Sequence, residues 1–163
     1  MKQMDEDFIQ LDGPLYLVGM KIHCWKCQGR MSAVALMCNY REENPNESEK
    51  DSEVEDELCL LSEIESLPED ILSNVTQRVP TFKLTFSKTV QRKYFANTCP
   101  SCSILSGDFF LHSEPGAPFF PTSAEEAAEL YITEVPYKSP AKVYAGLHFG
   151  SGDLILENAK KIT

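Results

Sequence analysis

The chain has 163 residues, of which 42% are hydrophobic and 25% are charged, so it can form one packed domain and is not disordered throughout. Its net charge of −10 argues against a protein that binds by neutralising nucleic-acid phosphates or an anionic membrane surface. The longest unbroken apolar run, 33–38, is far shorter than the about 20 residues of a membrane-spanning helix. Residues 1–7 show no apolar stretch after a basic start, which predicts a cytoplasmic protein without a secretory signal.

The negative charge is concentrated in one part of the chain. Residues 41–70 contain 13 acidic and two basic side chains, whereas the other residues are nearly neutral as a group. The densest part, 42–57, has Val54 as its one apolar residue, and this composition predicts a mobile loop. Such a loop either keeps the protein soluble or docks on a basic partner. For the second role, the candidate partner-binding residues are Glu53, Glu55, Asp56 and Glu57.

The first predicted elements form a β-hairpin. Residues 15–22 are rich in apolar and β-branched side chains and predict one strand, with a β-bulge expected at Gly19. Residues 31–38 predict the second strand. Cys24 and Cys27 lie between the two strands, so we expect them at the tip of the hairpin.

Two helices are expected next, within and after the acidic part. Apolar residues recur at helical spacing over 58–67. Ser66 and Glu69 have the spacing of a capping box, and Pro68 suits the first turn of a helix. We therefore expect a second helix that starts near Pro68 and ends before Pro80.

The second cysteine pair is also expected at the tip of a hairpin. Residues 81–86 alternate polar and apolar side chains, which is typical of a strand with one buried face. Residues 91–97 predict another strand that leads into Cys99 and Cys102, and 108–112 is the expected return strand.

The C-terminal part is expected to contain a helix and a hairpin. Residues 123–126 form a second capping box, which predicts a short helix to about Tyr131. Residues 142–149 and 154–157 flank the Gly-Ser-Gly-Asp sequence at 150–153, and we interpret them as two strands joined by a hairpin turn.

The two CxxC pairs, Cys24/Cys27 and Cys99/Cys102, carry the clearest chemical signal in the sequence. Zinc in structural sites takes four ligands at tetrahedral angles, and a two-residue spacer lets both thiolates of a tight turn face one ion. Two such turns supply all four ligands and leave no open position. The sequence therefore predicts one structural zinc ion per chain, bound by these cysteines.

Other interpretations of the cysteines remain open. Cys24 and Cys27 could form a redox dithiol, but such motifs precede a helix, and here a strand is expected. Disulfide bonds in an exported protein are a further alternative. Cys38 and Cys59 have no neighbour at ligand spacing and are interpreted as small buried hydrophobic residues. His23 could join the metal site, although we expect it on the opposite face of its strand.

With cysteine pairs at two hairpin tips, the chain resembles the zinc-ribbon group over residues 14–40 and 91–112. The usual knuckle has proline after its first cysteine and glycine after its second. Pro100 matches this pattern, whereas Trp25 replaces the proline, Ser103 replaces the glycine, and Gly29 comes one residue late.

Residues 94–102, followed by 107–111, are similar to a pattern in uncharacterised bacterial and phage zinc-ribbon proteins, which implies a prokaryotic or phage origin. The expected fold is a single β-rich α+β domain spanning 1–163. Its expected parts are a zinc-ribbon core of two hairpins (14–40 and 81–112), an acidic helical insert (41–80), and a C-terminal elaboration with a helix plus a hairpin (113–163).

The sequence contains no HExxH, GxSxG or glycine-rich phosphate-binding motif, so we do not expect an enzyme. We interpret the chain as a zinc-stabilised protein-binding module, most concretely a small acidic inhibitor or immunity-type protein that blocks a basic partner such as a nuclease effector. The alternative is a nucleic-acid-associated zinc ribbon, serving as a transcription or DNA-processing accessory factor. Its contact patch would be Lys83, Lys88, Arg92 and Lys93 with Tyr94 and Phe95. A zinc-stabilised enzyme subunit or a chaperone is a third, less favoured option.

Overall fold

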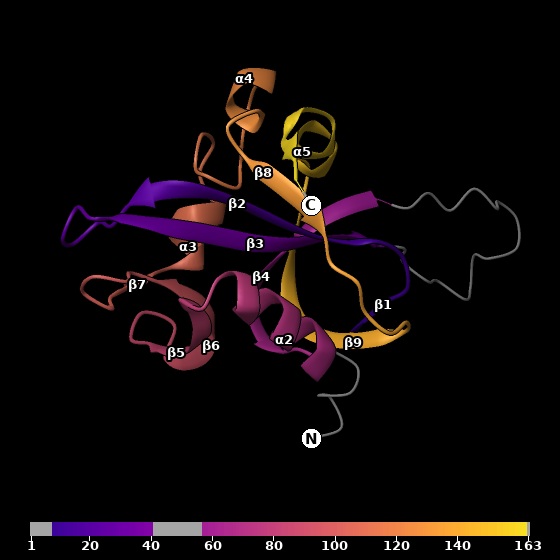
Figure 1. Ribbon diagram of the computed structural model, residues 1–163, viewed down its shortest axis with the longest axis horizontal. Coiled ribbons are helices and arrows are strands. Elements are labelled where there is room, and N and C mark those ends of the chain that lie inside the picture. Colours follow the sequence, from indigo (N-terminus) through magenta and orange to yellow (C-terminus); the bar gives the residue numbers. More distant parts are fainter. Residues whose placement is uncertain (1–7, 41–56, 163) are drawn as a thin grey trace, which may run out of the picture.

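The computed structural model describes residues 8–40 and 57–162, and it has a β-rich α+β fold (Figure 1). A curled mixed sheet forms its centre, with short helices around it. The elements are β1 (Ile9–Leu11), β2 (Leu15–His23), β3 (Arg30–Tyr40), β4 (Glu57–Ser66), α2 (Glu69–Arg78), β5 (Phe82–Ser87), β6 (Arg92–Thr98), β7 (Leu105–Ser106), α3 (Asp108–His112), α4 (Ala124–Ala127), β8 (Tyr131–Glu134), β9 (Ala141–Phe149), α5 (Gly152–Asn158) and β10 (Lys160–Lys161). The predicted mobile loop, apart from Glu57, lies outside the described residues.

The main sheet has the strand order β1-β9-β4-β3-β2-β8-β10. Its pairs are antiparallel except that β10 runs parallel to β8. The strands β5, β6 and β7 form an antiparallel extension, which joins the main sheet where Ile64 of β4 pairs with Phe95 of β6. The strand predictions for β2, β3, β5, β6 and β9 are therefore confirmed within one or two residues at each end.

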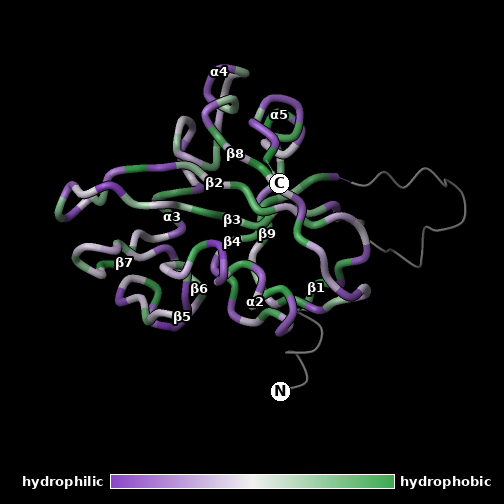
Figure 2. The backbone as a smooth tube through the Cα atoms, in the orientation of Figure 1, coloured by the Kyte–Doolittle hydropathy of each residue, from purple (hydrophilic) through white to green (hydrophobic). Residues whose placement is uncertain are grey.

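Hydrophobic side chains pack on both faces of the sheet. Much of the backbone of the central strands β3 and β4 is coloured as hydrophobic in Figure 2. On one face, Leu17 and Leu36 of the sheet belong to a core that includes Ile71 and Val75 of α2. On the other face, a second core contains Leu111 of α3 and Ile155 of α5, together with residues such as Val18 and Leu60. The sheet is thus the middle layer of the molecule.

The helix predicted over 58–67 is wrong, because this segment is the strand β4. Side chains on both faces of β4 are buried: Leu58 and Leu60 lie in one core, and Cys59 and Leu61 lie in the other. A strand buried on both faces has a continuous apolar run. Over a short distance, such a run also fits the spacing of a helix, so periodicity cannot separate the two.

The return strand predicted at 108–112 is also wrong, because these residues form the helix α3. Asp108, Leu111 and His112 are buried, whereas Phe109 and Phe110 are exposed by 69% and 57%. This spacing is helical. The return strand after the second cysteine pair is instead the two-residue β7.

The C-terminal hairpin predicted around 150–153 is absent from the described structure, because residues 152–158 form the helix α5. This helix packs so closely on β4 that a Cβ atom at Gly152 would lie 2.4 Å from the Cβ of Leu58. Glycine therefore permits the close helix–strand contact. Gly150, with φ of 108°, turns the chain between β9 and the helix.

The local predictions for the ends of helices had mixed outcomes. The capping box at α4 is confirmed in part: Ser123 Oγ accepts a hydrogen bond from Glu126 N, but the Glu126 carboxylate accepts one from Thr122 N rather than from Ser123 N. The helix ends at Ala127 and not near Tyr131, where β8 begins. The helix expected after Pro68 is α2, but its N-cap is Pro68 itself and Ser66 ends β4 instead. The bulge expected at Gly19 is also wrong, because β2 pairs with β3 through this position without a shift.

Asn97 of β6 joins the two hairpins that carry the cysteine pairs. Its Oδ1 accepts a hydrogen bond from Val34 N at 2.9 Å, and its Nδ2 donates to Val34 O at 3.1 Å. The ladder between β3 and β4 ends at the pair Leu36↔Leu61, so Val34 lies beyond it. The buried amide of Asn97 therefore replaces a strand neighbour for Val34 and fixes β6 against β3.

Asp108 stabilises the irregular part of β4, where the register of its pairing with β9 shifts. Its Oδ2 accepts a hydrogen bond from Glu63 N at 2.6 Å, and Glu63 adopts a left-handed φ of 48° at the irregularity in β4. Burial raises the pKa of Asp108 to about 7, although the hydrogen bond from Glu63 lowers it.

Replacing Asn97 with alanine should destabilise the protein, because Val34 N–H and C=O would both be left buried without partners. We expect the free energy of unfolding to fall by on the order of 3 kcal/mol, as measured by urea denaturation. Asn158→Ala is the control, since it removes one hydrogen bond to Leu154 O within α5. Equal losses in the two variants would contradict the bridging role of Asn97.

The raised pKa of Asp108 predicts a specific pH dependence. The folded state retains a proton on Asp108 that the unfolded chain, with a pKa of about 3.8, has released. Between these two pKa values, the contribution of Asp108 to the free energy of unfolding should therefore fall as pH rises, by up to roughly 1.4 kcal/mol per pH unit.

Asp108→Asn keeps an oxygen acceptor for Glu63 N but cannot titrate. We expect the difference in unfolding free energy, wild type minus variant, to decrease from pH 5 to pH 7 and then to level off. Parallel stability curves for the two proteins across this range would refute the assignment.

Candidate metal centre

The structure brings the four cysteines of the two CxxC pairs together at adjacent turns. Cys24 and Cys27 lie in the turn from β2 to β3, and Cys99 and Cys102 lie in the turn from β6 to β7. Each turn joins two antiparallel strands, as expected from the sequence, although the return strand of the second turn is only two residues long.

The two turns have the same backbone hydrogen bonds. In the first, Cys24 N donates to Gly29 O at 2.8 Å, and Gln28 N donates to Cys24 O at 2.9 Å. In the second, the corresponding bonds join Cys99 N to Ile104 O at 3.0 Å and Ser103 N to Cys99 O at 2.8 Å. The two turns are therefore equivalent knuckles.

The residue after the second cysteine is left-handed in both knuckles. Gln28 has a φ of 67° and Ser103 a φ of 68°. Glycine adopts this conformation without strain, whereas other residues adopt it at a cost of about 1–2 kcal/mol. The two knuckles thus share this backbone conformation although neither has glycine at the position.

The sulfur atoms have the spacing of a tetrahedral metal site. The Sγ atoms of Cys24 and Cys102 are 3.7 Å apart, those of Cys27 and Cys99 are 3.6 Å apart, and all four lie within 4.8 Å of one another. Four thiolates around an ion at about 2.3 Å would have edges of about 3.8 Å. All four cysteines are free thiols, so the group could hold one metal ion.

Backbone N–H groups point at the sulfurs and favour thiolates. Hydrogen bonds from Cys102 N and Ser101 N lower the pKa of Cys99 to about 6, and those from Cys27 N and Lys26 N lower the pKa of Cys24. Gly29 N also donates to Cys27, but close contact with the neighbouring thiols raises the pKa of Cys27 to about 11. Without a cation, Cys27 therefore keeps its proton, and metal binding would release it.

A small apolar cluster packs against the two buried cysteines of this group. Cys24 and Cys99 are buried with Met31, and Ile22 and Ile104 pack against them. Cys27 and Cys102 are exposed. The cysteine group thus lies at the edge of the molecule, with one ligand of each pair facing protein and the other facing solvent.

Trp25 connects the two knuckles. Its Nε1 donates a hydrogen bond to Leu105 O of β7 at 3.0 Å, and its ring is 55% exposed. Trp25 occupies the position where a knuckle usually has proline, and its hydrogen bond could not be predicted from the amino-acid sequence. The indole donor ties the first knuckle to the return strand of the second.

His23, Cys38 and Cys59 lie outside the four-cysteine group. His23 is exposed and is not part of the group. Cys38 and Cys59 lie opposite each other on β3 and β4, buried in the core, with their sulfurs 3.9 Å apart. The hydrogen bond with Cys38 and burial raise the pKa of Cys59 above its ordinary value, so it stays protonated. Both residues are core hydrophobes, as expected.

Asn97 is the positioning residue that the sequence analysis missed. It lies two residues before Cys99 and is a buried amide within the otherwise largely apolar stretch 94–98. An asparagine in such a strand could have indicated this role, because a buried side-chain amide needs hydrogen-bond partners for its donors and its acceptor.

The candidate partner-binding residues fall largely outside the described part of the chain. Glu53, Glu55 and Asp56 are among the residues that the structure leaves undescribed. Glu57 is exposed and begins β4, opposite Tyr40 at the end of β3. This end of β3 is opposite to the first knuckle, which lies before Arg30.

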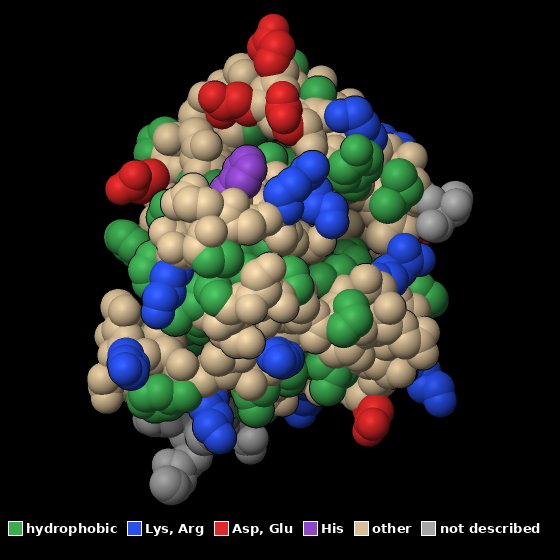
Figure 3. All heavy atoms as spheres, turned by 60° about the vertical axis from the view of Figure 1, so that its left-hand side comes forward, with side chains coloured by type: hydrophobic (Ala, Val, Ile, Leu, Met, Phe, Trp, Pro, Cys, Tyr) green, Lys and Arg blue, Asp and Glu red, His purple; other side chains and the backbone are tan. Residues whose placement is uncertain are grey.

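The basic patch of the nucleic-acid alternative is partly neutralised and partly buried. Arg92 pairs with both Glu63 and Glu65. Tyr94 and Phe95 are buried, so their rings cannot stack on bases. Lysine and arginine side chains are nevertheless spread over the knuckle side of the molecule, and most of the acidic side chains visible there lie at its top (Figure 3).

No protein-family model, curated protein or solved structure matches this chain. Within residues 8–40 and 57–162, no helix has the length and hydrophobicity needed to cross a bilayer. The function is therefore inferred from the site itself.

Replacing Cys99 with serine should abolish metal binding, because it removes a buried ligand with a low pKa. We expect one metal ion per chain in the wild type and none in the variant, by elemental analysis of protein purified without chelator. The variant should also lose cooperative thermal unfolding. Cys38→Ala, which removes a buried thiol outside the group, should retain the metal. Metal-free wild-type protein that is fully folded would contradict this prediction.

Proposed function

We propose that the four-cysteine group holds one zinc ion with a structural role. A sulfur-only tetrahedral set is typical of zinc or of an iron–sulfur site. Four protein ligands leave no open position for a water or a substrate, which is the arrangement of structural rather than catalytic zinc. The ion would join the β2–β3 hairpin to the β6–β7 hairpin through their tips.

We further propose that these two hairpins form a zinc-ribbon-like unit within the larger sheet. The equivalent hydrogen bonds and left-handed residues of the two knuckles support this proposal. The β7 strand is too short to hold the second knuckle by pairing alone, so the metal would supply much of the stability at this edge.

For the protein as a whole, we propose a non-enzymatic protein-binding module, most concretely a small acidic inhibitor or immunity-type protein that blocks a basic partner such as a nuclease effector. The observation that carries this proposal is the position of the acidic segment. Residues 41–56 connect β3 to β4 and hold eight acidic side chains, and Glu57 at the start of β4 is a ninth. These strands stay paired up to Tyr40 and Glu57, so the segment starts and ends at one fixed point.

This fixed point is remote from the metal. β3 has 11 residues between the first knuckle and Tyr40, which corresponds to roughly 33 Å. A partner that docks on the acidic segment would therefore leave the zinc site free. A concentrated patch of one sign speeds the encounter with an oppositely charged protein and competes with phosphate for a basic surface.

The alternative, a nucleic-acid-associated zinc ribbon, has less support. Its patch retains the exposed Lys83, Lys88 and Lys93, but Arg92 is paired, and the aromatic rings expected beside them are buried. The acidic segment would also repel phosphate.

The test uses the variant E53Q/E55Q/D56N/E57Q and a binding partner captured from native host cells with the tagged full chain. We expect the captured protein to be basic. The variant should associate about tenfold more slowly at low salt, because the steering charge is reduced. The salt dependence of its association rate should also weaken.

The control is E125Q/E129Q/E134Q/E157Q, which removes the same charge from four exposed sites elsewhere. It should bind the partner like the wild type. Equal effects of the two variants would show that only net charge matters and would refute the docking role. A gain in DNA or RNA binding by the first variant alone would instead support the alternative.

A further inference from the structure

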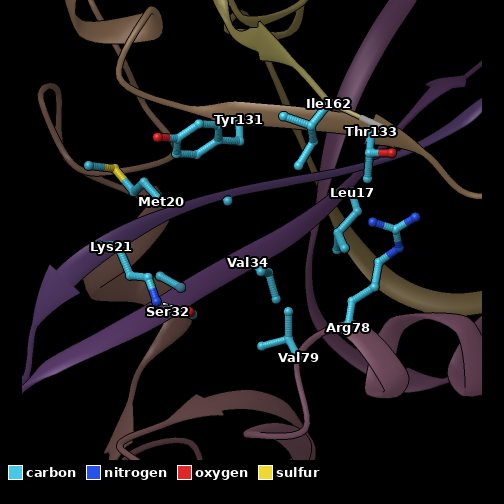
Figure 4. Close-up of a pocket in the computed structure, with 12 residues that line it drawn as sticks. Leu17, Met20, Lys21, Ser32, Val34, Arg78, Val79, Tyr131, Thr133 and Ile162 are labelled. Carbon is cyan, nitrogen blue, oxygen red and sulfur yellow. Dashed lines mark hydrogen bonds between the residues drawn. The ribbon is translucent and has the colours of Figure 1, made fainter.

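A cavity of about 360 Å³ opens on the sheet face formed by β2, β3 and β8 (Figure 4). None of its lining residues is a cysteine of the metal group or belongs to the acidic segment. We propose that this cavity binds a small organic anion, in which an apolar body carries a carboxylate.

Gly19 is one of the residues that line the cavity, and it contributes no side chain to fill the space. Gly19 of β2 pairs with Val34 on one side and Tyr131 on the other. A Cβ atom at Gly19 would lie 3.1 Å from both Ala33 O and Val34 Cγ1, so a side chain would be crowded there. Leu17, two residues earlier, belongs to the same sheet face and continues the apolar floor.

The walls come from two separate parts of the chain. Val79 follows α2 and lies on one side, and Ile162 lies on the other beside β8 (Figure 4). Ile162 is 47% exposed and Tyr131 is 43% exposed, so both present apolar surface to whatever enters. The volume is within the range of sites that bind small molecules, which is why we infer such a ligand rather than a protein.

The charge of the lining favours an anion. Lys21 and Arg78 are its two charged residues, and no aspartate or glutamate lines the cavity. Lys21 Nζ donates a hydrogen bond to Ser32 Oγ at 3.2 Å. Within the described residues, neither cation is within ion-pair distance of a carboxylate.

The two cations lie at opposite ends of the cavity, with Leu17 and Val34 between them (Figure 4). An apolar body can therefore lie across Gly19 while its acidic group reaches one end. We assign the carboxylate to Arg78, because a guanidinium forms paired hydrogen bonds with a carboxylate and is less strongly hydrated than an ammonium. Lys21 then adds a favourable charge at the other end.

The experiment compares octanoate, 1-octanol and inorganic phosphate by calorimetry and by amide chemical shifts. We expect octanoate to bind and to shift the amide signals of Gly19 and Val34. The neutral alcohol should bind about tenfold more weakly, and phosphate should not bind, since each lacks one of the two features. Equal binding of octanoate and octanol, or no octanoate binding at millimolar concentration, would overturn the proposal.

Two variants locate the site. Arg78→Gln should weaken octanoate binding about tenfold, as expected for the loss of a charge-assisted pair. Val79→Phe should block binding by filling the cavity while both cations remain. Arg30→Gln removes an exposed charge outside the cavity and should bind octanoate like the wild type. Circular dichroism confirms that each variant is folded, and unchanged binding in both cavity variants would refute the assignment.

Discussion

The pair of hydrogen bonds between the Asn97 amide and the backbone of Val34 is the contact on which the arrangement of the two knuckles depends. The cysteine pairs are separated by more than 70 residues of sequence and lie on different hairpins. The sulfurs can meet only if β6 is held at one register against β3. Asn97 achieves this because its amide satisfies both hydrogen-bonding groups of a residue that β4 has left without a strand neighbour. The proximity of the four cysteines is thus a consequence of how the sheet branches.

β4 is the strand at which the sheet branches. Its first half is buried between β3 and β9, and its second half turns toward β6. Glu63 marks the change, with its N–H bonded to the buried Asp108 and its carboxylate paired with Arg92. The helix α3, which supplies Asp108, also buries Leu111 in the second core. One bend in β4 therefore couples the core packing to the position of the knuckle hairpin.

The cysteine group, the cavity and the strand ends next to the acidic segment lie in separate parts of the structure. The cysteine group lies at one end of β3, in contact with a small apolar cluster, and could hold an ion that ties two hairpins together. The acidic segment leaves the sheet at the other end of the same strand. The cavity above Gly19 lies between them on the sheet face. A ligand at the cavity or a partner at the acidic segment could bind without disturbing the cysteine group, since the three regions share no ligating residue.

The sequence by itself determined the features that depend on residue type and on short-range spacing along the chain. The cysteine spacing gave the candidate metal ligands, the charge count gave the acidic segment, and alternating or apolar runs gave β2, β3, β5, β6 and β9. Only the tertiary structure decided what depends on burial. Residues 58–67 form a strand rather than a helix because both faces are covered. Residues 108–112 form a helix that buries Asp108, Leu111 and His112 on one face and leaves Phe109 and Phe110 exposed. The hydrogen bonds between Asn97 and Val34 connect two strands that are far apart in the sequence, and the space above Gly19 is likewise lined by residues of several strands. Contacts between residues so far apart produce no periodic pattern in the amino-acid sequence, so they could not be predicted from it.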